Sequence, residues 1–187
     1  SHADHDHIGG AITLCAHHQT NRLWSQTSIP GCPKAQLPQT AVFNDLTIRR
    51  LDTADDWVRG RNERSLVVAI SVPGHRLLFL GDIGIDREQD LAQRIGNATI
   101  VKVPHHGSRS SSSSELVSEV SAKIALIGAG PNDRFGHPHA DIVAVVSRSG
   151  STFNSDFCSL APLAEAHGIP CFLADGQSQD AMAAWLT

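Results

Sequence analysis

The sequence predicts an α/β fold with a mixed sheet, in which short strands alternate with amphipathic helices. Two apolar runs, SLVVAISV at 65–72 and RLLFLGD at 76–82, are joined by Pro73-Gly74 and predict a hairpin. Downstream, helical patterns and short apolar runs alternate, as in layered α/β folds. The 187 residues are 41% hydrophobic and 18% charged, so we expect a single domain over residues 1–187.

The other elements are expected in chain order. A helix over 8–18 precedes an irregular connection over 19–45 that is rich in Pro, Gly and Gln. The further elements are a strand at 46–51, a helix over 86–95 that ends at Gly96, a strand at 99–103, a helix near 115–121, a strand at 123–128, a helix near 140–148, and strand candidates at 170–174 and 181–186. Ser112 and Glu115 have the spacing of a capping box for the helix near 115–121.

Charge, hydropathy and cysteine spacing limit the function classes. The formal net charge of -4 is not typical of a nucleic-acid-binding domain, although bound metal ions would offset carboxylates locally. No apolar run reaches the roughly 18 to 20 residues that span a bilayer. The cysteines form no CxxC pair, which argues against a zinc ribbon; they are Cys15, Cys32, Cys158 and Cys171. Disulfides in an oxidising compartment and buried thiols in a reducing one are both compatible with this spacing.

The first ten residues, SHADHDHIGG, carry the densest set of metal-ligand side chains. His2, Asp4, Asp6 and His7 are separated by one or two positions, so that a tight loop can direct all of them to one place. A tag remnant or a solvated terminus is the alternative, but the alternation of Asp with His and the apolar continuation IGGAITLCA disfavour it. The segment therefore predicts a metal site.

Further candidate residues follow the predicted strands. Asp82 comes directly after LLFLG, where its carboxylate is placed to bridge two cations, with helix capping as the alternative. His105 and His106 precede a Gly-Ser pair, and a loop there allows both to approach one site; a satisfied surface pair is the alternative. His137 and His139 lie in GHPH, where the proline stiffens the loop.

These segments resemble a known family. SHADHDHIGG resembles the HxHxDH signature of metallo-β-lactamase-fold hydrolases, with Asp4 where most members have the second His. NERSLVV, LLFLGDI, KVPHHGSRSSSS and DRFGHPH, in this order, resemble the ComEC family of competence DNA-uptake proteins, over roughly residues 1–150. The resemblance implies a four-layer αββα sandwich with a binuclear metal centre. Because the fold normally opens with strands and a glycine-rich turn before the HxHxDH loop, we expect the domain to be N-terminally incomplete in this chain.

The resemblance also implies a ligand set. By position it assigns His2 and Asp4 to one ion, Asp6 and His7 to the other, Asp82 to the bridge and His137 to the last ligand position. Asn62 and Ser65 occupy the region of the fold's middle His ligand and are placed among the catalytic residues. A site richer in oxygen than usual shifts the preference towards manganese over zinc. We expect two divalent ions, Mn or Zn, and no organic cofactor.

The catalytic and substrate-binding roles follow by position as well. Asp6 orients the attacking hydroxide, and either His105 or His106 matches the proton-donating or phosphate-contacting His of nuclease members. Two divalent ions in such a site lower the pKa of a water molecule and place it in line with a phosphorus atom. The residues that flank the site and would hold the phosphate backbone are Lys102, Ser108, Arg109 and Arg134.

The resemblance thus implies a metal-dependent nuclease that degrades the non-imported DNA strand. Its expected partners are DNA, as a single strand or the non-transported strand, and the membrane channel portion of the same parent chain. In that family the domain would face outward, to the periplasm or the cell exterior, where Cys158 and Cys171 could oxidise. A stand-alone hydrolase of a small ester, thioester or lactam, and a non-catalytic binding module with a decayed metal site, are the alternatives.

Overall fold

The computed structural model describes residues 2, 4–17, 23–24, 28–35, 38–52, 60–129, 134–142, 152–154 and 171–172. Its strands are β1 (Leu23–Trp24), β2 (Lys34–Ala35), β3 (Thr40–Phe43), β4 (Leu46–Arg50), β5 (Val68–Val72), β6 (His75–Phe79), β7 (Ile100–Lys102), β8 (Ile124–Leu126), β9 (Thr152–Asn154) and β10 (Cys171–Phe172). Its helices are α1 (His5–His17), α2 (Ile85–Ile95) and α3 (Ser114–Val120), with the 3-10 helices η1 (Asn62–Arg64) and η2 (Pro104–Gly107). The α/β class predicted from the sequence is confirmed.

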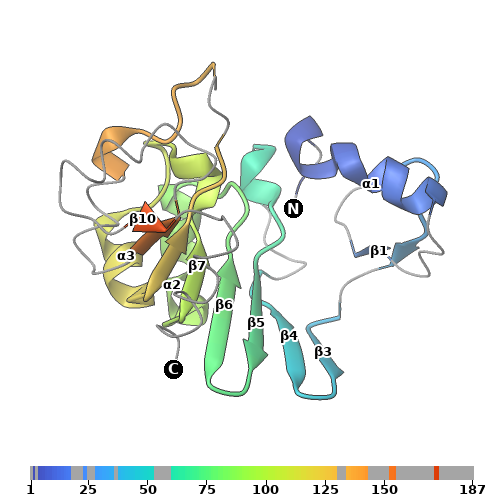
Figure 1. Ribbon diagram of the computed structural model, residues 1–187, viewed down its shortest axis with the longest axis horizontal. Helices are drawn as coiled ribbons and strands as arrows, with labels where there is room; N and C mark the ends of the chain where they lie inside the picture. Colours follow the sequence, from blue (N-terminus) through green and yellow to red (C-terminus); the bar gives the residue numbers. More distant parts are fainter. Residues whose placement is uncertain are drawn as a thin grey trace.

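Most of these strands join one mixed sheet. Its eight strands have the order β10-β9-β8-β7-β6-β5-β4-β3, and β1 and β2 form a separate parallel pair. Neighbouring strands are antiparallel from β3 to β6 and parallel from β6 to β10. The strands β6, β7 and β8 therefore end at the same edge of the sheet, which we call the carboxyl edge. In Figure 1 the N-terminus lies towards this end, while the β3–β4 and β5–β6 turns lie at the opposite end.

The hydrophobic core joins the sheet to α2 and α3. Leu78 and Leu80 are fully buried in one cluster with Leu91 and Ile95 of α2. Leu91 and Ile95 are four positions apart and so share one face of an amphipathic helix. Burial of each such side chain contributes about 1.5 to 3 kcal/mol of transfer free energy. This packing fixes the elements from which the carboxyl-edge loops emerge.

Helix α1 lies outside this core. None of its residues is buried, and Ile12 is 49% exposed. A disulfide between Cys15 and Cys32 links the helix to the loop before β2. The sequence was compatible with either disulfides or free thiols. For Cys15 and Cys32 the structure contains the disulfide. The expected oxidation of Cys158 and Cys171 concerns side chains outside the described ones.

The predicted start of the first helix, at residue 8, is wrong. Helix α1 begins at His5, because the backbone N–H groups of His7 and Ile8 donate to the carbonyl oxygen of Asp4 at 3.0 and 3.1 Å. Asp6 and His7 consequently project from the first helical turn rather than from a loop. Adjacent helical positions point in directions about 100° apart.

The predicted irregular connection over 19–45 is also wrong in part, since it contains β1, β2 and β3. Strand β3 pairs with β4, with Thr40 opposite Arg49 and Phe43 opposite Leu46. Val42 and Phe43 are 65% and 54% exposed. Apolar residues that remain exposed on an edge strand do not alternate with buried ones, so the sequence lacks the period-two signal of a half-buried strand.

The predicted capping box at Ser112 and Glu115 is displaced by one residue. The N-cap of α3 is Ser113, whose hydroxyl accepts from the backbone N–H of Leu116 at 3.2 Å. Ser112 has a φ of 63° and directs its N–H to the buried carboxylate of Glu88. A contact with α2 thus decides where α3 begins.

The C-terminal expectations are met in part. Strand β10 lies within the predicted strand at 170–174, whereas β9 was not predicted. The predicted helix near 140–148 is described only over 140–142, where the backbone is helical, and the strand candidate at 181–186 lies outside the described residues.

Candidate metal centre

The carboxyl edge of β6 and β7 presents a buried carboxylate and two histidines. Gly81, with a φ of 63°, turns the chain after β6 and directs it to Asp82, which is 4% exposed. The backbone N–H of Asp82 donates to Ser65 Oγ at 2.9 Å, and this bond holds the backbone from which the carboxylate projects. His105 and His106 follow β7, the parallel neighbour of β6, and their loop lies beside that of Asp82.

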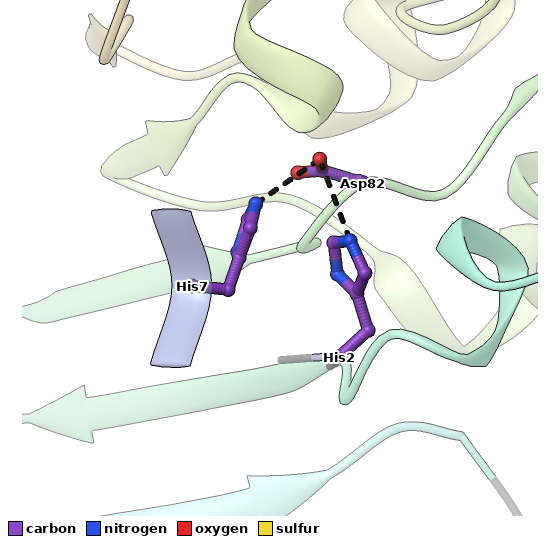
Figure 2. A group of neighbouring side chains, drawn as sticks. All are labelled: His2, His7 and Asp82. Atoms are coloured by element: carbon purple, nitrogen blue, oxygen red, sulfur yellow. Dashed lines mark hydrogen bonds and ion pairs between the residues drawn. The ribbon is translucent and has the colours of Figure 1, made fainter. Parts of the chain in front are cut away.

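A first group of potential metal ligands consists of His2, His7 and Asp82. Figure 2 shows the rings of His2 and His7 directed towards the Asp82 carboxylate. His7 Nε2 lies 3.1 Å from Asp82 Oδ2, and His2 Nε2 lies 3.9 Å from the same oxygen. Nδ1 of His2 lies 3.2 Å from the Ser65 hydroxyl, so donation from Nδ1–H to Ser65 would leave Nε2 as a ligand atom. Imidazole nitrogens and a carboxylate oxygen are typical donors for zinc and related divalent ions.

A second group shares His7 and adds Asp6 and His106. His106 Nε2 lies 3.1 Å from Asp6 Oδ2 and 3.2 Å from His7 Nε2. It also lies 3.5 Å from Asp82 Oδ2, so Asp82 contacts members of both groups. The two groups are adjacent and share His7. The ligand set implied by the resemblance instead assigned His7, with Asp6, to a single ion.

The backbone sorts the two neighbouring histidines into different environments. His105 and His106 have φ values of 49° and 53°, in the left-handed region that non-glycine residues rarely occupy. His106 Nδ1 donates to the carbonyl oxygen of Gly128, which leaves the Nε2 lone pair directed at the ligand groups. His105 instead accepts from Asn62 Nδ2 at 3.0 Å and has Ser110 Oγ 3.1 Å from its Nδ1.

The electrostatics of the site favour the metal-binding forms of Asp82 and His2 but oppose that of His106. Burial opposes ionisation of Asp82, but hydrogen bonds from His106 and His7 outweigh it and hold the pKa of this carboxyl well below its usual range. Burial lowers the pKa of His2, which keeps its imidazole neutral. The hydrogen bond to Asp82 raises the pKa of His106, so a metal ion and a proton compete for His106 Nε2.

The residues present fit divalent cations. Asp82 Oδ1 is buried and, within the part of the chain that the structure describes, has no hydrogen-bond partner. A buried carboxylate oxygen that is left without a partner costs about 1 to 3 kcal/mol or more, and a metal ion would satisfy it. An ion held by the first group would therefore remove an otherwise uncompensated cost.

Asp4 is engaged differently from the other predicted ligands. Its Oδ1 accepts from Arg61 Nη1 at 2.9 Å, and its Oδ2 lies 3.5 Å from His2 Nε2. The hydrogen bond from Arg61 lowers the pKa of this carboxyl. Asp4 is thus next to the first group but paired with an arginine that sequence reasoning had not singled out.

His137, the predicted last ligand, lies beside the ring of His106 but belongs to neither ligand group. Its ring centroid lies 6.4 Å from that of His106 and 5.7 Å from that of His105. The second ligand group contains His106 and does not include His137. The neighbouring His139 packs edge-on against His137, with 5.1 Å between the ring centroids.

The predicted phosphate-binding residues have other contacts. Lys102 Nζ donates to the carbonyl oxygen of Val103 at 2.9 Å, and burial lowers the pKa of its amine. Arg109 pairs with Asp141, and the Arg134 guanidinium lies 4.6 Å from the centre of the Phe135 ring. Ser108 Oγ lies 3.0 Å from Ser110 Oγ.

Sequence reasoning missed the groups that support the ligands. Glu63 accepts from the backbone N–H of Gly84 at 3.1 Å, and a Cβ added to Gly84 would lie 2.8 Å from the Glu63 carboxylate. Ser110 and the carbonyl oxygen of Gly128 hold the two adjacent histidines. Only the serine run offered a signal for any of these contacts, since backbone carbonyl groups carry no residue identity.

Comparison with protein families defines the class of this protein. A model of the metallo-beta-lactamase superfamily matches residues 1–130, and the chain belongs to that superfamily, a class of metal-dependent hydrolases. More particularly, the chain is 29% identical over 167 residues to ComE operon protein 3 of Bacillus subtilis (strain 168), covering 79% of this chain and 22% of that protein. It is 27% identical over 152 residues to Recombination protein 2 of Haemophilus influenzae, covering 79% of this chain and 19% of that protein. The resemblance to the ComEC family is thereby confirmed.

Both of these relatives are much longer than this chain. The chain spans about a fifth of each of these two relatives, 22% and 19%. A solved structure of a metallo-beta-lactamase superfamily protein from Thermotoga maritima has 16% identity and a TM-score of 0.44, and the match covers 64% of this chain and 60% of that chain. In the part of the chain that the structure describes, no helix is both long and apolar enough to cross a membrane.

Proposed function

We propose that this chain is a metal-dependent phosphodiesterase domain of a competence DNA-uptake protein, and that it hydrolyses the DNA strand that is not imported. One observation carries the proposal. His7 Nε2, His106 Nε2 and Asp82 Oδ2 lie 3.1 to 3.5 Å from one another at the carboxyl edge of the sheet. Such a convergence of donors is what a hydrolytic metal centre requires.

The chain's own residues supply the remaining chemistry. Divalent ions in this centre would lower the pKa of a water molecule and polarise a phosphoryl oxygen. Asp6, on the first turn of α1, would accept a hydrogen bond from that water and so orient it. His105 is the proposed proton donor to the leaving oxygen, through its Nε2. The leaving oxygen would take the place of the Asn62 amide, which lies at Nε2 in the structure, while Ser110 holds the ring at Nδ1. Ser65 positions both His2 and Asp82.

The proposed metal is manganese or zinc. Carboxylates of Asp6 and Asp82 stand beside the imidazoles in the ligand groups, and the Asp4 carboxylate is adjacent. Carboxylate-rich sites favour manganese more than nitrogen-rich ones do, so we place manganese slightly ahead of zinc. Lys102, Arg109 and Arg134 are the proposed contacts to the DNA backbone, with Ser108.

The proposed location is the outer side of a membrane, attached to a channel in a longer parent chain. The curated relatives are far longer than this chain, which covers 22% and 19% of them. The disulfide between Cys15 and Cys32 supports an oxidising compartment, since disulfides persist in the periplasm and outside cells.

A hydrolysis assay with matched variants tests the function. With Mn²⁺ or Zn²⁺ the protein should cleave single-stranded DNA, and Asp82→Asn and His7→Ala should lose at least about 100-fold in rate, as expected when a group that organises the charged centre is removed. His5→Ala is the matched control, because His5 is exposed on the same helical turn and lies in neither ligand group. Wild-type cleavage by Asp82→Asn, or turnover of a lactam or small ester with no cleavage of DNA, would overturn the proposal.

A further inference from the structure

Phe135 is an exposed aromatic side chain close to the candidate metal centre. It is 60% exposed, and single exposed apolar side chains are common, as Phe43 at 54% on the edge strand β3 illustrates. What distinguishes Phe135 is its position in a series of aromatic rings. Its ring lies 5.8 Å from that of His137 at an angle of 26°, and the ring of His137 lies 6.4 Å from that of His106 at 14°.

The series leads from solvent to the second ligand group. His106, at its inner end, has its Nε2 3.1 Å from Asp6. Phe135, at its outer end, carries the guanidinium of Arg134 at 4.6 Å from its ring centre. An aromatic face next to an exposed arginine, at a short distance from a hydrolytic centre, is the combination that proteins use to bind single-stranded nucleic acids.

The segment that carries Phe135 is anchored to the histidine loop. The backbone N–H of His139 donates to the carbonyl oxygen of Gly107 at 3.0 Å. Pro138 packs so closely that a Cβ at Gly107 would lie 2.5 Å from the Pro138 Cβ. Arg109 and Asp141 form an ion pair at 2.9 Å between the same two segments. These contacts hold the backbone that follows Phe135 beside the histidine loop, and the His137 ring lies between Phe135 and His106.

We propose that Phe135, with Arg134, stacks on a base of single-stranded DNA and so places the adjoining phosphate in the metal centre. This inference rests on the proposed function and adds to it a contact with a base of the substrate, in addition to the contacts with its phosphates. Bases of a single strand expose their faces, whereas those of a duplex are stacked on each other. Stacking also explains how a chain with a net charge of -4 holds DNA with little help from bulk charge.

Binding without hydrolysis gives the cleanest test. The probe is a labelled oligodeoxythymidylate, titrated with the protein in EDTA and followed by fluorescence anisotropy; a second probe has the same backbone with abasic sites. Phe135→Ala should raise the dissociation constant for the thymidylate about tenfold, within the range expected for loss of one stacked base, and leave that for the abasic probe unchanged. Phe135→Trp should retain binding, and Phe135→Leu should lose it, because leucine is apolar without a ring.

Phe43→Ala is the matched control, since Phe43 is comparably exposed. It lies on β3, the outermost strand of the sheet, which β4 and β5 separate from β6. Thymidylate binding by Phe135→Ala at the wild-type level, an equal loss on the abasic probe, or no binding of the thymidylate by the wild type would each overturn the inference. A wild type that binds as expected but cleaves no DNA with Mn²⁺ or Zn²⁺ would overturn the proposed function and leave the stacking site standing.

Discussion

His7 Nε2 and His106 Nε2 lie 3.2 Å apart although the two residues are separated by 99 positions in the sequence. One nitrogen comes from the first turn of α1 and the other from the loop after β7. With His106 Nδ1 bonded to the Gly128 carbonyl oxygen, its Nε2 presents a lone pair, and a cation is the natural occupant of the space between the two rings. The candidate centre therefore joins the N-terminal segment to the main sheet.

The first prediction separates the two adjacent histidines. His106→Ala should weaken binding of Mn²⁺ or Zn²⁺ by at least about 10- to 100-fold, the range found even for residues that only support metal ligands. His105→Ala should leave the metal content unchanged and lower only the rate of hydrolysis. Isothermal titration with each ion, together with metal analysis, measures both. The reverse pattern, with metal lost in His105→Ala, would show that the assignment is inverted.

A second prediction concerns the contact between Gly107 and Pro138. Gly107 has a φ of 80°, and an added Cβ would overlap the Pro138 Cβ at 2.5 Å. Gly107→Ala should lower the free energy of unfolding by about 2 kcal/mol or more, since the left-handed conformation alone costs about 1 to 2 kcal/mol. Gly128→Ala is the control, because its nearest neighbour would be Lys102 Cε at 3.8 Å. Equal stability of the two variants in denaturant titrations would contradict the prediction.

The third prediction uses the buried Glu88 carboxylate, which accepts from the backbone N–H groups of Ser112 and Ser113. Burial raises the pKa of Glu88 above its usual value of 4.5 despite these bonds. The folded protein then binds a proton more tightly than the unfolded chain, so this group's contribution to stability falls as pH rises from about 4.5 through the folded-state pKa.

Glu88→Gln removes that titration. The difference in unfolding free energy between wild type and Glu88→Gln should shift in favour of the wild type as pH is lowered from 7 towards about 4.5. Urea titrations of both proteins across this range provide the measurement. A difference that stays constant with pH, or moves the other way, would argue against the raised pKa.

A fourth prediction concerns the disulfide that holds α1. Cys15 and Cys32 are 17 residues apart, and closure of a loop of that size stabilises a fold by about 3 kcal/mol. Cys15→Ser should lose stability of this order and also bind metal more weakly, because α1 buries none of its residues and carries Asp6 and His7. Dithiothreitol should reproduce the loss of metal affinity in the wild type and leave the metal affinity of Cys15→Ser unchanged. Full metal affinity after reduction would mean that α1 is held by other contacts.

Local patterns were sufficient for most of the sheet. The hairpin at Pro73-Gly74 was predicted because its strands are apolar and its turn residues are specific. The edge strand β3 was not, because its apolar residues remain exposed. Strand β9 has no recognisable strand pattern in the sequence. Its place is given by its parallel pairing with β8.

By itself the sequence determined which side chains are available to a metal site, because His and Asp residues follow the predicted strands and crowd the first ten positions. Only the tertiary structure decided that the loops after β6 and β7 meet, since it makes these two strands parallel neighbours. It also decided that His106 rather than His105 faces the ligand groups, that His7 serves both groups, and that His137 lies beside the ring of His106 but in neither group. The reason is physical. These choices depend on positive backbone φ angles and on contacts with carbonyl groups distant in the chain, such as that of Gly128, and neither leaves a trace in residue periodicity.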